Sequence, residues 1–159
     1  MPKTRPTNRT AVVTERLELE FRLDCPPERA FRAFTEKIDL WWPKGHRSSA
    51  DATIVFEARD GGRLLERGPA GERTIGEVTD WSPPTALAFD WRLGAAENPT
   101  HVEIRFEHAA DGTSVRVTHT PGAAADDGIW PRMVARFENG WTASVAALSD
   151  FLAKEDDGQ

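Results

Sequence analysis

The sequence predicts an α+β domain in which a curved antiparallel sheet of seven strands wraps around one long carboxy-terminal helix. In residues 130–152, large apolar side chains recur every three or four positions, which is the spacing of an amphipathic helix. Most of the chain before that segment alternates between apolar and polar residues in short runs separated by turn signals, which favours antiparallel strands that neighbour one another in sequence. Because only one sizeable helix is available to cover a twisted sheet, we expect a small-ligand cavity between the two.

Composition fits a single globular domain. The chain has 159 residues, of which 39% are hydrophobic and 29% charged, and no apolar run approaches the roughly 20 residues of a membrane span. We therefore expect no membrane insertion, and a cytoplasmic location because the amino terminus lacks the features of a secretory signal. The net charge of −6, with both signs interleaved, gives no support to a nucleic-acid surface. The predicted domain covers residues 12–153, with flexible tails over 1–11 and 154–159.

The first elements are a strand and two short helices. Alternation over residues 13–23 predicts a half-buried strand. Pro27 can occupy the first turn of a following helix, where its missing N–H has no partner. The apolar face continues to Trp41 through a break near Thr35, so two short helices are expected. Residues 44–49 then read as an exposed loop.

Six strands in hairpin succession should follow, and then the long helix. The strands are expected at residues 53–59, 63–65, 72–81, 86–93, 102–108 and 115–119. In the last hairpin, Asp111-Gly112 is a strong turn signal, and placing it at the turn centre pairs Phe106 with Val117 and Ile104 with His119. Asp126 or Asp127 could cap the long helix, and Pro131 fits only in its first turn.

Aromatic side chains are the main candidates for a binding site. The chain has six tryptophans, eight phenylalanines and no tyrosine. We predict an apolar site lined by Trp42, Phe56, Phe89, Trp91, Phe106, Met133, Phe137 and Trp141, with Arg63 or His119 offering one polar contact. Gly140 lies inside the long helix, where glycine costs roughly 1 kcal/mol relative to alanine. We expect this cost to be compensated by a close approach of backbone or ligand to that turn.

Metal and nucleophilic chemistry find little support in the residue pattern. The predicted pairing places His108 and His119 about 13 Å apart, too far to share a metal ion. Cys25 is the only cysteine, so it cannot form an internal disulfide. No serine lies in a glycine-flanked nucleophile elbow. We therefore expect no metal, no cofactor and no assigned catalytic residue, and regard His119 as the better candidate for a polar group in the pocket.

Several short motifs resemble one known family. They are Pro26 to Phe31 after the first strand, Trp41-Trp42, Gly61-Gly62-Arg63, Gly76-Glu77-Val78 running into Trp81 to Pro84, Asp111 to Thr113 leading to Val115 to Val117, and Gly140-Trp141. Over roughly residues 12–153 the chain resembles bacterial relatives of the carboxy-terminal domain of the activator of the heat-shock protein 90 ATPase. Their superfamily includes the birch-pollen allergen, steroidogenic-acute-regulatory-type (START-like) lipid-transfer domains and polyketide cyclases. The resemblance implies the helix-grip fold, but a fold does not determine a function.

Three functions therefore stay open. The first is binding of a small hydrophobic ligand, aromatic or lipid-like, between the sheet and the long helix. The second is binding of a chaperone or another protein, which would need an exposed surface such as residues 44–49 with Trp41 and Trp42. The third is a cyclase- or dehydratase-type enzyme that uses a pocket histidine, His119, as general acid and base. We rank ligand binding first and enzyme activity last.

Overall fold

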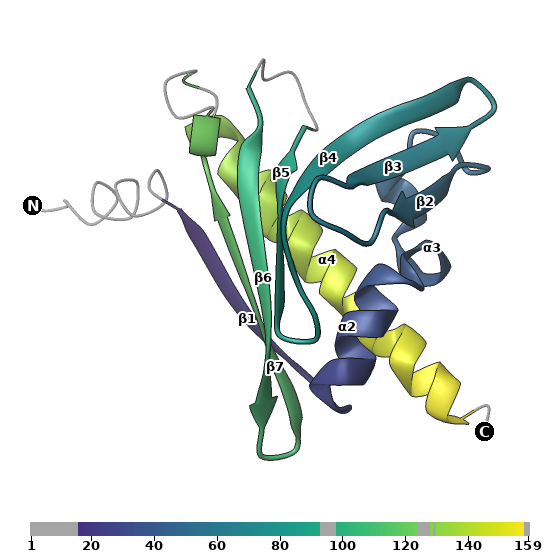
Figure 1. The fold of residues 1–159 in the computed structure, drawn as a ribbon, viewed down its shortest axis with the longest axis vertical. Helices are drawn as coiled ribbons and strands as arrows, with labels where there is room; N and C mark the ends of the chain where they lie inside the picture. Colours follow the sequence, from purple (N-terminus) through teal and green to yellow (C-terminus); the bar gives the residue numbers. More distant parts are fainter. Residues whose placement is uncertain (1–15, 93–97, 124–127, 129, 158–159) are drawn as a thin grey trace, which may run out of the picture.

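The computed structural model describes residues 16–92, 98–123, 128 and 130–157. It has the predicted α+β architecture: a seven-stranded antiparallel sheet curls around a long carboxy-terminal helix in a helix-grip arrangement (Figure 1). The expected tail over residues 1–11 and the candidate helix caps Asp126 and Asp127 lie outside the described residues. None of the described helices is long and apolar enough to cross a membrane.

The elements follow the predicted order. They are β1 (Leu17–Leu23), α2 (Pro27–Thr35), α3 (Ile38–Trp41), the short 3₁₀ helix η1 (Lys44–His46), β2 (Thr53–Phe56), β3 (Arg63–Gly68), β4 (Gly71–Ser82), β5 (Ala86–Trp91), β6 (Thr100–Ala109), β7 (Gly112–Thr120) and α4 (Trp130–Asp157). The strand order in the sheet is β1-β7-β6-β5-β4-β3-β2. After β1 the chain therefore passes through the short helices to the opposite edge, and the six later strands return step by step to β1.

The predicted break between the two short helices is confirmed. The Thr35 hydroxyl donates to the carbonyl oxygen of Phe31 at 2.8 Å, at the end of α2. The Trp41 indole N–H then reaches back to the carbonyl oxygen of Ala33 at 2.8 Å. This bond holds α3 against α2 and turns the following residues toward α4.

The β6–β7 hairpin differs from the predicted register by two residues. Phe106 pairs with Val115 rather than Val117, because Gly112 is the first residue of β7 and not the centre of the turn. A Cβ atom on Gly112 would collide with the carbonyl oxygen of Leu23, so glycine lets the start of β7 approach the end of β1. A shift of two residues leaves every side chain of the strand on its predicted face.

The long helix α4 continues past the predicted domain boundary. The expected tail began at Lys154, but the helix runs to Asp157. Its last turn is held by Arg29 of α2, whose guanidinium lies 2.7 Å from the carboxylate of Asp156 and 3.3 Å from that of Glu155. These contacts join residues far apart in the sequence, so the local hydrophobic pattern gave no sign of them.

Candidate functional site

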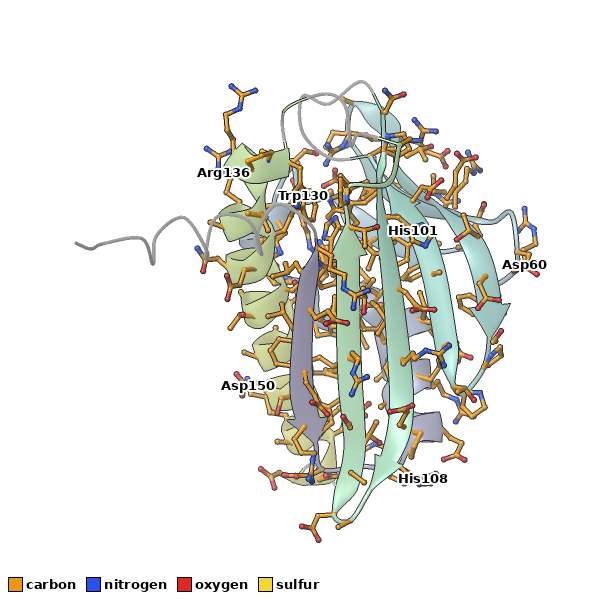
Figure 2. The ribbon with its side chains drawn as sticks, turned by 90° about the vertical axis from the view of Figure 1, so that its left-hand side faces the viewer. Asp60, His101, His108, Trp130, Arg136 and Asp150 are labelled. Carbon is orange, nitrogen blue, oxygen red and sulfur yellow. The ribbon has the colours of Figure 1, made fainter. Side chains whose placement is uncertain are left out.

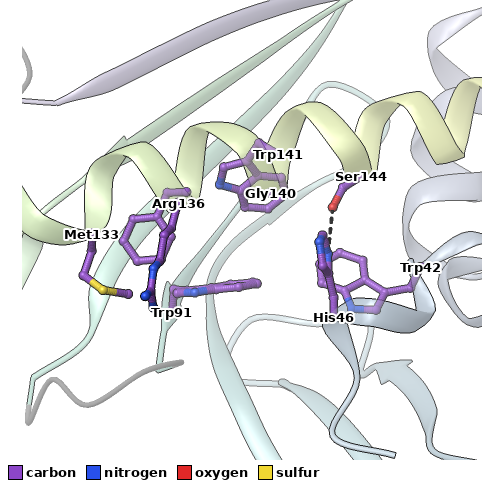
Figure 3. A pocket seen from close by; sticks show the side chains of 9 residues that line it. Trp42, His46, Trp91, Met133, Arg136, Gly140, Trp141 and Ser144 are labelled. Atoms are coloured by element: carbon purple, nitrogen blue, oxygen red, sulfur yellow. Dashed lines mark hydrogen bonds between the residues drawn. The ribbon is translucent and has the colours of Figure 1, made fainter. Parts of the chain in front are cut away.

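A cavity of about 210 Å³ lies between α4, the end of β5 and the segment from the end of α3 into η1 (Figure 3). It is lined by Trp42, His46, Trp91, Met133, Arg136, Phe137, Gly140, Trp141 and Ser144. The α4 residues among them recur at intervals of three or four, so one face of that helix covers the cavity. Pockets for drug-sized ligands typically measure 300–1,000 Å³, whereas a cavity of about 150 Å³ holds benzene. This cavity matches a ligand of one or two rings.

Three indole rings enclose the cavity. Trp91 of β5 lies below α4 with its ring centroid 5.6 Å from that of Trp141 (Figure 3). Trp42, at the end of α3, has its centroid 6.2 Å from that of Trp91. Such surfaces suit a flat apolar ring, which can stack on one indole and meet another by its edge.

The three indoles are held in different ways. The N–H of Trp141 donates to Nδ1 of His119 at 3.1 Å. The N–H groups of Trp42 and Trp91 are buried and have no hydrogen-bond partner among the described residues. Packing alone therefore orients these two rings, whereas a hydrogen bond fixes Trp141.

His119 supports the cavity wall from behind and does not line the cavity. Its side chain is 0% exposed. An indole N–H can only donate, so Nδ1 accepts from Trp141 and Nε2 carries the proton, which it donates to Oγ1 of Thr100 at 2.8 Å. The ring also stacks on Phe137 with centroids 4.2 Å apart. Burial, and to a lesser extent the charge of His101, lowers the pKa of His119 to about 3, so the ring is neutral near pH 7.

This arrangement leaves His119 without a free nitrogen for proton transfer. Both ring nitrogens are used in buried hydrogen bonds, and a group that does not line the cavity cannot reach a ligand there. General acid–base catalysis requires the catalytic group within hydrogen-bond reach of the substrate. The expected polar contact from His119 is therefore replaced by a positioning role toward Trp141 and Phe137.

Among the described residues, a single charged side chain lines the cavity. Figure 3 shows Met133 and Arg136 toward one end, and His46 and Ser144 toward the other. Oγ of Ser144 lies 3.5 Å from Nδ1 of His46, and burial lowers the pKa of His46, which favours its neutral form. The lining residues that the structure describes are thus mostly apolar, with one cation, Arg136, and no carboxylate.

Arg47 explains why the η1 segment forms a wall of the cavity. Its side chain is 7% exposed. Its guanidinium donates to the Asp39 carboxylate at 2.7 Å and to the carbonyl oxygens of Asp39, Trp42 and Ala52 at 2.8, 2.8 and 2.9 Å. The predicted loop at residues 44–49 is exposed or half-buried throughout, but it contains the short helix η1, and these bonds hold the segment to α3.

The two tryptophans expected in a docking surface for a chaperone-type partner are buried. That surface required Trp41 and Trp42 to be exposed, but their side chains are only 5% and 4% exposed. Both indoles pack into the core that faces α4. The second functional hypothesis therefore loses the two tryptophans of its expected surface, whereas Lys44, Gly45 and Ser48 remain exposed.

The structure brings together half of the predicted site residues. Trp42, Trp91, Met133, Phe137 and Trp141 line the cavity. Phe89 lies behind them, with ring centroids 5.8 Å from Trp91 and 6.5 Å from Trp141. The remaining predicted side chains lie elsewhere: Phe56 and Phe106 pack around Phe34, and Arg63 is paired with Glu57 at 3.2 Å on the surface.

Four lining residues were not among the predicted site residues: Gly140, which was singled out only for a close approach of backbone or ligand, and Ser144, Arg136 and His46. Ser144 lies on the apolar face of α4, and the helical spacing could have identified it. Arg136 lies outside that face, and its long side chain reaches the cavity from the side (Figure 3). His46 depends on the folding of η1, which has no local sequence signal.

The histidines of the last hairpin are far apart. His119 pairs with Val102, not Ile104 as predicted, and His108 pairs with Thr113. Six strand residues then separate the two histidines, which corresponds to about 20 Å. Figure 2 shows His108 near the lower end of the sheet and His101 well above it. Among the described residues, no group of three or more His, Cys, Asp or Glu side chains could hold a metal ion.

Comparisons with known proteins agree with this architecture. A family model described as "Activator of Hsp90 ATPase homolog 1-like protein" matches residues 24–153. A search of curated proteins finds no match. Protein MLL2253 from Mesorhizobium loti has a similar structure, with a TM-score of 0.68 and 20% sequence identity over 87% of this chain and 97% of that one. Protein NE0264 from Nitrosomonas europaea gives a TM-score of 0.64 and 19% identity over 91% and 97%. At these identities the two structures support the fold alone.

Proposed function

The chain belongs to the family of activator of Hsp90 ATPase homolog 1-like proteins, and from this premise we propose that it binds a small aromatic molecule in the cavity between α4 and β5. The observation that carries the proposal is the lining of the cavity. Trp42, Trp91 and Trp141 surround a space that Gly140 leaves open on the face of α4.

Cavity size narrows the class of ligand. A volume of about 210 Å³ equals that of about seven water molecules in the liquid, at roughly 30 Å³ each. A compact ring system uses such a space more completely than a long acyl chain does. The proposal therefore favours one or two fused rings over the lipid-like ligands that the sequence left open.

The indole rings of Trp42 and Trp91 can adjust to a ligand, which also supports ligand binding. The buried N–H groups of Trp42 and Trp91 lack partners among the described residues, and a buried unsatisfied donor costs about 1–3 kcal/mol. These rings can turn without breaking a hydrogen bond, and an acceptor atom on a ligand would then satisfy an N–H group. Trp141 stays fixed by His119 and provides a constant surface.

Thermal unfolding in the presence of small aromatic compounds tests the proposal. Indole, naphthalene derivatives and quinoline should raise the Tm, whereas a linear acid of similar mass should not. A ligand at about a hundred times its Kd adds roughly 2.7 kcal/mol, which corresponds to several degrees in a domain of this size.

A matched pair of variants locates the binding. Gly140→Leu fills the cavity, so it should abolish the Tm shift while the protein stays folded. Asn139→Leu adds the same side chain at an exposed position of the same turn and should leave the shift intact. The proposal fails if no aromatic compound raises the wild-type Tm, or if Gly140→Leu responds like the wild type. In the former case the search would move to protein partners.

A further inference from the structure

We propose that the aromatic ligand of this cavity is an anion, a ring carrying a carboxylate, and that Arg136 binds its charged group. This inference rests on the proposed function and names the chemical class of its ligand. Three features support it: the charges that line the cavity, the ionic partners of the arginines, and the position of Arg136 relative to the indoles.

The described residues that line the cavity carry charge of one sign. Among them Arg136 is the only one with a permanent charge, and none is an aspartate or glutamate. The other titratable lining group is His46, whose pKa is lowered by burial, so it adds no charge near pH 7. From the described lining residues, an anion that enters this cavity meets an attractive charge and no opposing one.

Arg136 forms no ion pair with another described residue. Several other described arginines are held in ion pairs, such as Arg29 with Asp156 and Arg63 with Glu57, whereas Arg136, like Arg132, is in none. Within that same part of the chain, no carboxylate lies within ion-pairing distance of Arg136. Its guanidinium therefore keeps its donors available, and a planar guanidinium matches a carboxylate in a bidentate geometry.

The position of Arg136 on α4 relates its charge to the indole rings that line the cavity. Arg136 precedes Gly140 by one helical turn, and its side chain extends from α4 toward Trp91 (Figure 3). A ring that lies in the cavity against Trp91 and Trp141 would thus carry its substituent toward the guanidinium. A second hollow, lined by Glu18, Leu19, Glu20 and Arg116, combines its one arginine with two carboxylates and no aromatic ring among the described residues.

The expected preference is moderate because Arg136 is exposed to solvent. An exposed ion pair contributes less than a buried one, and charge-assisted hydrogen bonds add to it. We expect 2-naphthoate to bind about three- to tenfold more tightly than 2-naphthamide, its uncharged analogue of nearly the same shape. The preference should shrink as ionic strength rises, because salt screens exposed charges.

Calorimetric titration of both compounds tests the inference. Arg136→Gln should bring the affinity for 2-naphthoate down to that for 2-naphthamide and leave the affinity for the amide unchanged. Arg132→Gln is the matched control: it removes an exposed arginine that lies one turn earlier on α4 and does not line the cavity. This control should keep the preference for the acid.

The outcomes separate the inference from the function on which it rests. If wild type binds both compounds equally, or if the two arginine variants lose the preference to the same extent, Arg136 does not select an anion, while aromatic binding stands. If neither compound binds to the wild type, both the inference and the proposed function fail. Binding of the acid that survives Gly140→Leu would place it outside the cavity and overturn the inference.

Discussion

Replacing Gly140 by alanine should make the protein more stable and a weaker binder. A Cβ atom at this position would have a single neighbour within reach, Cε1 of His46 at 4.0 Å, which is ordinary van der Waals contact. No strain therefore opposes the intrinsic helix preference for alanine, which is about 1 kcal/mol per residue. The free energy of unfolding should rise by about this amount, which corresponds to a Tm increase of roughly 2–4 °C.

The added methyl group also enters the cavity. A ligand that fills about 210 Å³ must then shift or be compressed, so the affinity for 2-naphthoate should fall several-fold. Urea unfolding measures the first effect, and calorimetric titration measures the second. Asn139→Ala, at an exposed position of the same turn, should gain some stability by helix propensity and keep full affinity. A Gly140→Ala protein that is less stable, or that binds as well as the wild type, would refute the reasoning.

Further predictions concern the groups that support the cavity. The pKa of His119 is about 3 in the folded protein, against 6.5 for an unperturbed histidine. As the pH falls, the unfolded chain therefore binds this proton before the folded protein does. Stability is therefore full above about pH 6.5, and guanidinium unfolding should show a loss of about 2 kcal/mol between pH 7 and pH 5. His119→Gln should be less stable at pH 7 but have a flatter profile in that window; an unchanged slope would contradict the assignment. Arg47→Met should lower the free energy of unfolding, measured in urea, by about 2–3 kcal/mol, because carbonyl oxygens lose a charged donor. A loss near zero would show that the hydrogen bonds of Arg47 do not stabilise the fold. Arg29→Ala should lower the free energy of unfolding by only about 1 kcal/mol, because the ion pairs of Arg29 are partly exposed. Limited proteolysis should then release the end of α4. If the variant resists the protease as well as the wild type does, Arg29 does not anchor this end.

Local periodicity was sufficient to predict most of the fold. The spacing of apolar residues identified α4, and alternation identified the strands. The register of the last hairpin could not be predicted from its turn residues, because it depends on the approach of Gly112 to Leu23, which is distant in sequence. The extension of α4 to Asp157 likewise depends on Arg29 of α2.

The candidate site was only partly predictable, for two physical reasons. Alternation shows which face of a strand a residue occupies but not whether it touches a cavity, so Phe106 was grouped with Trp91 although it is core. Polar lining residues depend on tertiary contacts that short sequence patterns do not reveal: His46 lies at the cavity because Arg47 folds its segment. Gly140 was the clearest local signal, since a helix has no reason of its own to contain glycine there.

The indole N–H signals of the six tryptophans test most directly whether this cavity is the binding site. They can be assigned in a ¹⁵N-labelled sample by single Trp→Phe variants and followed during titration with 2-naphthoate. Trp42, Trp91 and Trp141 line the cavity, whereas Trp81 packs against Phe31 away from it. If the ligand binds in this cavity, the first three signals should show saturable shifts and that of Trp81 none. Shifts centred on Trp81, or no shift at any indole, would contradict the assignment of this cavity as the binding site.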